Sequence, residues 1–260
     1  VEGEIAVTVV CNDRAMTAET DVVDRVYGSS VDLPFDVTVR ERLGREALRD
    51  ALERDSDFFH YVGHIDDRGF ECRDGWLHAD SVAHVGVDAF LLNACRSYEQ
   101  GAELVRAGAV GGIVTLSDVL NDGAVRVGKQ LARLLNRGFP LTGALDVARA
   151  GGVSDQYVVV GDGRSTLART EGGPPNAPVV TTLGDDAYRL AYHAYPTTRV
   201  TTGSMVRPLL GDDEHYLFSG HVDTFDLDGD ALADFLSLET VPVRFDGDLH
   251  WSDDVDLDAL

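Results

Sequence analysis

Residues 58–64 read Phe-Phe-His-Tyr-Val-Gly-His, and residues 87–95 read Val-Asp-Ala-Phe-Leu-Leu-Asn-Ala-Cys. Short apolar runs of this kind, rich in aromatic and branched side chains, are typical of buried parallel β-strands. The first run ends on His64 and the second on Cys95. In open α/β sheets, ligands bind outside the carboxyl ends of the strands. The two runs therefore predict a thiol beside its base at one edge of a sheet.

Strand-like and helix-like segments alternate over the first three-fifths of the chain. Strands are expected over 5–11, 35–39, 110–116 and 157–160, and helices over 17–27, 40–55, 98–107, 121–137 and 140–151. A hairpin is expected over 69–78, with its turn at Asp74-Gly75. This alternation predicts an α/β fold with a mostly parallel sheet and helices on both faces.

The character of the sequence changes near residues 171–178, where Gly and Pro cluster. We expect an N-terminal domain over residues 1–163 and a small β-rich α+β module over residues 164–260. Within the module, strands are expected over 188–195, 198–209 and 216–225, a helix over 230–238, and a hairpin turning at Asp246-Gly247.

The composition is strongly acidic, with 45 Asp and Glu residues against 22 Lys and Arg residues and a net charge of −23. Such a charge excludes nucleic acid as a default partner. The chain has 33 Asp, 21 Arg and a single lysine, Lys129. At about 1 M salt the Debye length falls to about 3 Å, so repulsion among so many carboxylates is screened. The composition therefore predicts a halophilic, archaeal-type acidic protein.

The cysteines and the apolar runs indicate the compartment. Cys11, Cys72 and Cys95 form a sparse and odd set, which favours a reducing cytoplasm over a disulfide framework. No apolar run reaches the length of about 18–20 residues that a membrane span needs, and no signal peptide is evident. We expect a cytoplasmic protein with no membrane partner. Because the chain begins at Val1 rather than Met, an upstream sensor or regulatory region is also expected.

A thiol attacks a carbonyl group as its thiolate, and a neighbouring histidine is the usual means of forming one. Cys95 precedes the helix expected from residue 98, whose N-terminal dipole favours an anion. An arbitrary cysteine is more often a buried structural residue, but the paired strand end at His64 favours chemistry here. His60 is expected in the core. Cys72, His78 and His84 match no zinc-module spacing, so no metal site is predicted.

The stretch Asn93-Ala94-Cys95-Arg96 resembles the Gln-Ala-Cys-Arg-Gly signature of caspases. The larger series from about residue 5 to residue 161 resembles the CHAT domain of caspase-like cysteine peptidases, in the clan of caspases, metacaspases and separases. The segments that carry this resemblance, in chain order, are 60–64, 91–95, 101–109, 112–119 and 157–162.

The resemblance implies catalytic roles. Cys95 would be the nucleophile, and His64 the general base that later protonates the leaving amine. The backbone N–H groups of Cys95 and Ile65 would form the oxyanion hole. The family usually has Gly at the position of Ile65, and a β-branched residue tolerates a positive φ poorly. Either the backbone has ordinary geometry there, or the hole is impaired.

The resemblance also implies substrate-binding positions. Asn93 aligns with a residue that lines the primary specificity pocket, and Ser117 and Asp118 align with the strand end that borders bound peptide. Ser117 replaces the usual Trp of the family. Together with Asp66 and Asp67, Asp118 would make the cleft negative, which favours cleavage after Arg or Lys over cleavage after Asp.

The sequence thus predicts a cysteine endopeptidase that cleaves a protein substrate without a cofactor and is regulated by a partner or an upstream region. The alternative is a catalytically decayed caspase-like adaptor, which Ile65 favours and the retained Cys and His oppose. A third class, a small-molecule-binding domain, would need a glycine-rich phosphate loop after the first strand. The sequence there is Cys11-Asn12-Asp13-Arg14.

Lowering the salt concentration is expected to destabilise this protein. At about 0.01 M salt the Debye length is about 30 Å, so the carboxylates repel one another across the surface. Circular dichroism melts in molar KCl and in dilute buffer measure the effect. Equal melting temperatures in the two buffers would contradict the halophile prediction.

Overall fold

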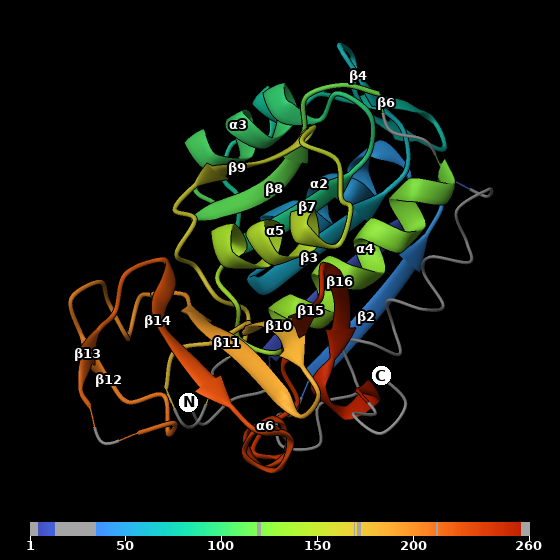
Figure 1. Cartoon of the computed structure of the whole chain (residues 1–260). Helices are drawn as coiled ribbons and strands as arrows, with labels where there is room; N and C mark the ends of the chain where they lie inside the picture. Colours follow the sequence, from blue (N-terminus) through green and yellow to red (C-terminus); the bar gives the residue numbers. More distant parts are fainter. Residues whose placement is uncertain are drawn as a thin grey trace.

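The computed structural model describes residues 5–13, 35–118, 121–168, 170, 173–211 and 213–255. The helix expected over residues 17–27 lies outside these residues. A six-stranded sheet forms the centre of the N-terminal part (Figure 1). Its strand order is β2(Phe35–Glu41), β1(Ile5–Cys11), β3(Ser56–Val62), β7(Val87–Asn93), β8(Gly111–Thr115) and β9(Tyr157–Gly161). The first five strands run parallel and β9 runs antiparallel to β8, which confirms the mostly parallel α/β fold.

Helices cover both faces of this sheet, as predicted. On one face, Phe58, Leu91 and Ile113 pack in a core with α4(Asn121–Asn136) and α5(Leu141–Ala150). On the other face, Phe59, Tyr61 and Phe90 pack in a second core with α2(Arg45–Glu53) and α3(Tyr98–Arg106). Successive side chains of a strand point to opposite faces, so β3 serves both cores through alternate residues.

Two glycines allow the layers around α3 to approach closely. A Cβ at Gly112 in β8 would lie 2.2 Å from the ring of Phe90, and one at Gly101 in α3 would lie 2.4 Å from Val114 Cγ1. Either methyl group would overlap atoms of a well-packed core. The absence of a side chain at these positions therefore sets the spacing between α3 and the strands that precede the candidate site.

A small antiparallel sheet follows β3. It contains β4(Ile65–Asp66), β5(Gly69–Cys72) and β6(Gly75–Leu77), and the 3-10 turn η2(Ala79–Ser81) comes next. The hairpin expected over 69–78 is confirmed, and β4 extends it by one strand. Residues 65–81 are called the insert below. The insert contacts α2 through β6 and α3 through η2.

The C-terminal module has a five-stranded sheet of its own. Its order is β14(Gly220–Leu227), β11(Ala187–Ala194), β10(Val179–Gly184), β15(Pro242–Phe245) and β16(Asp248–Trp251). The remaining elements are α6(Gly229–Ser237), the pair β12(Met205–Val206) and β13(His215–Tyr216), and η3(Ser252–Asp254). The hairpin at Asp246-Gly247 is confirmed. The strand expected over 198–209 is wrong except at β12, and β10 was not predicted.

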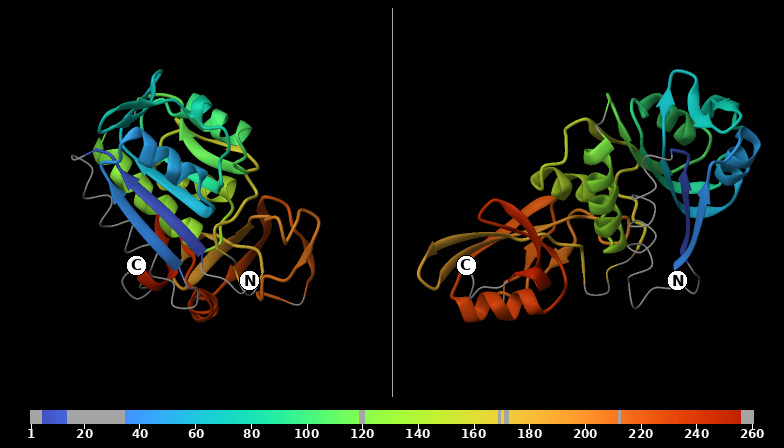
Figure 2. Two further views of the ribbon diagram at one scale, coloured as in Figure 1. Left: turned by 180° about the vertical axis from the view of Figure 1, so that it is seen from behind. Right: turned by 90° about the vertical axis from the view of Figure 1, so that its right-hand side faces the viewer.

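The module packs beside α4 and α5 (Figure 2). The rings of Tyr195 and Phe139 lie 5.6 Å apart, and the Tyr195 hydroxyl donates to Asp146 Oδ2 at 2.8 Å. The Arg133 guanidinium lies 3.8 Å above the Trp251 ring. The domain boundary after residue 163 stays a prediction. The two sheets share no strand, which favours separate domains, but Tyr195 and Trp251 of the module pack against the core of the N-terminal part, which favours a single unit. Among the described residues, no helix combines the length and the apolarity that crossing a membrane requires.

Candidate active site

His64 and Cys95 lie at the same edge of the six-stranded sheet. Strands β3 and β7 are adjacent and parallel, with Val62 paired to Asn93. His64 follows Val62 by two residues, and Cys95 follows Asn93 by two residues. The carboxyl ends of adjacent parallel strands meet at one edge, so the two residues leave the sheet side by side. This placement is the one predicted from the two apolar runs.

The backbone at His64 is held by Tyr61. The buried Tyr61 hydroxyl lies 3.2 Å from the carbonyl oxygen of His64 and 3.0 Å from that of Glu71, and it can donate to either. Burial raises the pKa of Tyr61 well above its usual value, so the hydroxyl stays protonated. A Cβ at Gly63 would lie 2.8 Å from this hydroxyl oxygen, so only glycine fits between the strand and His64.

The carboxylate of Asp13 contacts the imidazole of His64, and sequence reasoning missed this contact. His64 Nε2 lies 3.2 Å from Asp13 Oδ2; the imidazole is 55% exposed and the carboxylate side chain 13% exposed. Asp13 follows β1, which is adjacent to β3 on the side away from β7. His64 therefore stands between a carboxylate from one neighbouring strand end and the cysteine from the other.

Asn12 fixes the strand end that carries Asp13. Its N–H donates to the carbonyl of Val62 at 2.8 Å, which joins the ends of β1 and β3. Its side chain donates to the carbonyl of Glu71 at 2.8 Å and accepts the N–H of Leu43 at 2.8 Å. These three bonds to the backbone hold the segment that carries Asp13 beside His64.

Cys95 lies in the turn between β7 and α3, where it is partly buried. The buried pair Ser97 and Thr115 ties this turn to β8. Ser97 Oγ donates to the carbonyl of Leu92 at 3.1 Å and accepts the N–H of Thr115 at 2.9 Å, while Thr115 Oγ1 donates to the carbonyl of Ala94. The position of Cys95 is thus fixed from both sides of the turn.

Arg96 has a φ of 49°, an uncommon value for a residue with a side chain. Its N–H donates to the carbonyl of Ser117 at 3.2 Å, which contributes to holding the turn against the end of β8. Its guanidinium bonds Asp118 at 3.0 and 3.2 Å. Ser117 is half-buried and Asp118 is exposed. Because both contact Arg96, the residue after Cys95, they lie at the sheet edge beside Cys95.

The charges expected to attract a basic substrate are already compensated in part. Asp118 pairs with Arg96, and Asp66 pairs with Arg68 through contacts of 2.6 and 3.1 Å. The hydrogen bonds from Arg68 lower the pKa of Asp66. Asp67 is exposed in the turn that follows. The sequence predicted a negative cleft, but two of its three acidic side chains form ion pairs with arginines. These pairs could not be seen in the sequence.

Asn93 is fully buried, with 0% exposure. Its Oδ1 accepts the hydroxyl of Tyr157, in β9, at 2.7 Å. This bond spans from β7 past β8 to the antiparallel edge strand. The substrate-binding role expected for Asn93 stays a prediction, and it would need this side chain to become accessible.

Ile65 has ordinary strand geometry. It lies in β4, is 4% exposed, and is absent from the residues with positive φ. The N–H of Glu71 donates to the carbonyl of His64 at 2.9 Å, and Ile65 is the next residue along the ladder, opposite Phe70. Antiparallel pairs alternate between bonded and non-bonded, so the N–H of Ile65 points away from β5.

The other candidate side chains lie apart from this edge. His60 is buried in β3, and burial lowers its pKa to about 3, so its ring stays neutral in the core as expected. Burial raises the pKa of the Cys72 thiol to about 11. Within the described part of the chain, no three His, Cys, Asp or Glu residues are grouped to hold a metal ion.

No family model and no curated protein sequence matches this chain. Similar solved structures include the complex of RgpB pro- and mature domains from Porphyromonas gingivalis, at 12% identity and a TM-score of 0.47 over 86% of this chain and 61% of that one. The Arg-specific cysteine proteinase gingipain R is 14% identical, with a TM-score of 0.45 over 85% of this chain and 60% of that one. The Saccharomyces cerevisiae separase–securin complex is 14% identical, with a TM-score of 0.44 over 60% of this chain and 12% of that one. This chain thus spans about three-fifths of the first two.

Proposed function

We propose that this chain is a caspase-like cysteine endopeptidase of the CHAT type, which cleaves a protein substrate with Cys95 as nucleophile and His64 as base. One observation carries the proposal. His64 stands at a sheet edge between the strand end that bears Cys95 and the strand end that bears Asp13, whose carboxylate it contacts at 3.2 Å. A nucleophile, a base and a group that orients the base form the pattern of nucleophilic catalysis.

The contact to Asp13 assigns the two nitrogens of the imidazole. A neutral ring donates from one nitrogen and accepts at the other. With Nε2–H donating to Asp13, Nδ1 is the nitrogen that takes the thiol proton. The sulfur then attacks the substrate carbonyl carbon to form a tetrahedral intermediate, and the C–N bond breaks as the imidazolium returns the proton to the leaving amine. Water, activated by the same ring, hydrolyses the thioester.

The oxyanion of the intermediate requires two donors. We assign these to the N–H groups of Cys95 and Ile65, at the two strand ends. The direction of the Ile65 N–H, away from β5, supports this assignment. The ordinary backbone of Ile65 removes the main reason for expecting an impaired hole. The catalytically decayed adaptor remains the second candidate, and the labelling experiment below separates the two.

The composition supports the setting proposed for this enzyme. The set of three cysteines is sparse and odd in number, which favours a reducing cytoplasm as the compartment we propose. A peptidase in that compartment requires restraint, so we include a regulatory partner or an upstream region in the proposal. The halophilic character rests on the 33 Asp residues and the single lysine.

Cys95 is expected to react selectively with a peptidyl chloromethyl ketone in molar KCl. Mass spectrometry should map the adduct to Cys95, and Cys95→Ala should abolish it. His64→Ala should slow labelling by roughly 10²- to 10⁴-fold, because a positioned base contributes about that much. Cys72→Ala is the matched control: because Cys72 is buried, its removal should leave the labelling of Cys95 unchanged. A folded protein that takes no label at Cys95 would favour the adaptor.

Asp13→Asn is expected to lower kcat about 10- to 100-fold with little change in KM. A hydrogen bond to a charged group is worth about 1.5–3 kcal/mol, and each 1.4 kcal/mol is tenfold in rate. The alkylation rate of Cys95 should fall in parallel. Asp67→Asn removes an equal charge three residues after His64 without touching the imidazole contact. Equal losses in both variants would show that net charge, rather than orientation of His64, is responsible.

Cleavage after Arg or Lys is expected to depend on exchange at Asp118, because the substrate must replace Arg96 there. Arg96→Asn should raise kcat/KM for Arg substrates about 2- to 5-fold, since an exposed ion pair is worth up to about 1 kcal/mol. Asn tolerates the positive φ of this position. Asp118→Asn should lower the same ratio, and Arg106→Gln, at the far end of α3, should leave it unchanged. Wild-type cleavage chiefly after Asp, lost in Arg96→Asn, would instead make Arg96 the selecting group.

A further inference from the structure

A cavity of about 560 Å³ lies between α2 and the insert, apart from the sheet edge that carries His64 and Cys95. Its cationic and polar lining comprises Arg45, Arg49, Arg68, Trp76, His78 and Ser81. Arg45 and Arg49 are four residues apart on α2 and therefore share one helix face. Three arginines around one cavity are unusual in a chain with twice as many acidic as basic residues.

Asp74 also lines the cavity, but it mainly serves the helix. Its Oδ1 accepts the N–H of Arg45 at 2.7 Å, at the start of α2. The N-cap residue Gly44 has no side chain that could do so. That hydrogen bond lowers the pKa of Asp74. The Arg45 guanidinium is 3.9 Å away, so its charge is only loosely compensated.

Arg68 forms one wall of the cavity. Its guanidinium bonds Asp66 and lies 3.9 Å above the Trp76 ring. These two contacts fix its position, and its Nε and Nη2 donate to Asp66. Arg68 therefore supplies shape and a part of the positive potential, whereas its hydrogen bonds are already directed to Asp66.

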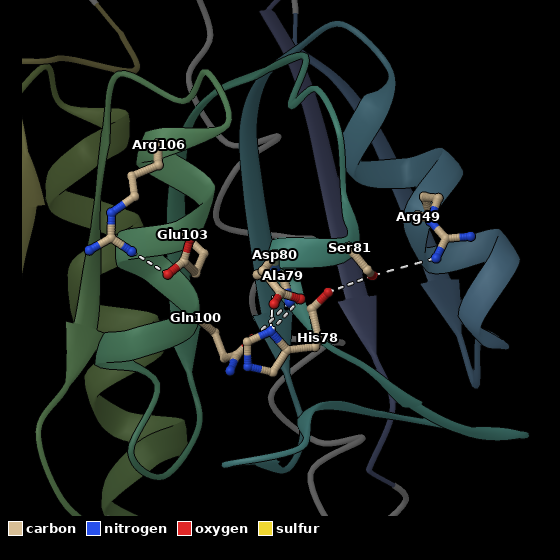
Figure 3. Close-up of polar contacts among 8 residues, drawn as sticks. All are labelled: Arg49, His78, Ala79, Asp80, Ser81, Gln100, Glu103 and Arg106. Atoms are coloured by element: carbon tan, nitrogen blue, oxygen red, sulfur yellow. Dashed lines mark hydrogen bonds and ion pairs between the residues drawn. The ribbon is translucent and has the colours of Figure 1, made fainter.

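The guanidinium of Arg49 has few hydrogen-bond acceptors around it. Its Nε is buried and has no hydrogen-bond acceptor among the described residues. Its Nη2 lies 3.5 Å from Ser81 Oγ, at the long limit for a hydrogen bond (Figure 3). The Ser81 hydroxyl donates its own proton to the carbonyl of His78 at 2.7 Å. Glu46 shares the cavity, but in the described part of the chain no carboxylate lies within 4.0 Å of the Arg49 guanidinium.

A buried guanidinium N–H without an acceptor is unfavourable, and oxyanions are the acceptors that its planar fork fits best. We propose that this cavity binds a single small oxyanion, a phosphate group or a carboxylate, through the Nη groups of Arg49, with Arg45 as the second cation. A bound oxyanion joins α2 to the insert. This proposal does not depend on peptidase activity.

Inorganic phosphate and acetate are the two probes, titrated by calorimetry into the full chain in KCl at constant ionic strength. Binding of either probe to the wild type is expected, with at least tenfold weaker binding to Arg49→Gln. Arg54→Gln is the matched control, because Arg54 is exposed just beyond the end of α2. Stronger binding of phosphate indicates a phosphate-bearing ligand, and stronger binding of acetate indicates a carboxylate.

Arg49→Lys and melting curves keep the test decisive if Arg49→Gln folds poorly. Lysine retains the charge and loses the fork, so its affinity should fall below that of the wild type. Phosphate also stabilises proteins in general by exclusion from their surface, so only the difference from Arg54→Gln counts. Equal affinity and equal thermal shifts in the wild type, both Arg49 variants and Arg54→Gln would overturn the proposal.

Discussion

The parallel pairing of β3 with β7 is the constraint on which the candidate site depends. With Val62 opposite Asn93, the chain leaves both strands at the same level of the sheet. A shift by one residue would turn each side chain to the other face and remove His64 from the neighbourhood of Cys95. The register is held by burial on both faces, since Phe58 and Leu91 enter one core and Phe59 and Phe90 the other.

Buried polar groups then convert this sheet edge into a defined geometry. Asn12 joins the ends of β1 and β3, while Ser97 and Thr115 join the turn after β7 to β8. Each of these side chains uses both donor and acceptor capacity on backbone groups that strand ends would otherwise leave unsatisfied. The loops that carry Asp13 and Cys95 are thus fixed by hydrogen bonds, although loops usually lack a core of their own.

The fold was predictable from sequence because its elements have strong local signals. Apolar runs marked β3 and β7, and Gly108 marked the end of α3, the helix after β7. The short strand β12 and the missed strand β10 show where the signal fails: Thr198–Leu209 alternates like a strand but pairs only at Met205 and Val206. Pairing partners distant in sequence decide such segments, and propensity does not report them.

The positions of the candidate site residues could be predicted only where a residue follows a strand. His64 and Cys95 each end an apolar run, so their place at the sheet edge followed from the sequence. Asp13 also follows a strand, but among 33 Asp residues nothing local distinguished it. Asp118 was identified by its position, whereas its pairing with Arg96, 22 residues earlier, depends on the turn after Cys95 and could not be seen in the sequence.

Arginine forms short ion pairs at defined positions in this strongly acidic chain. Screening at high salt weakens the long-range repulsion of the carboxylates, but it acts little on groups in direct contact. The short pairs of Arg96 with Asp118 and of Arg68 with Asp66 each use a planar fork on a carboxylate. Lysine, as a hydrated point charge, has no planar fork with which to bond both oxygens of a carboxylate in this way. In these two pairs, at the sheet edge near Cys95 and at the cavity beside α2, charge therefore acts through the geometry of a direct contact rather than through long-range attraction.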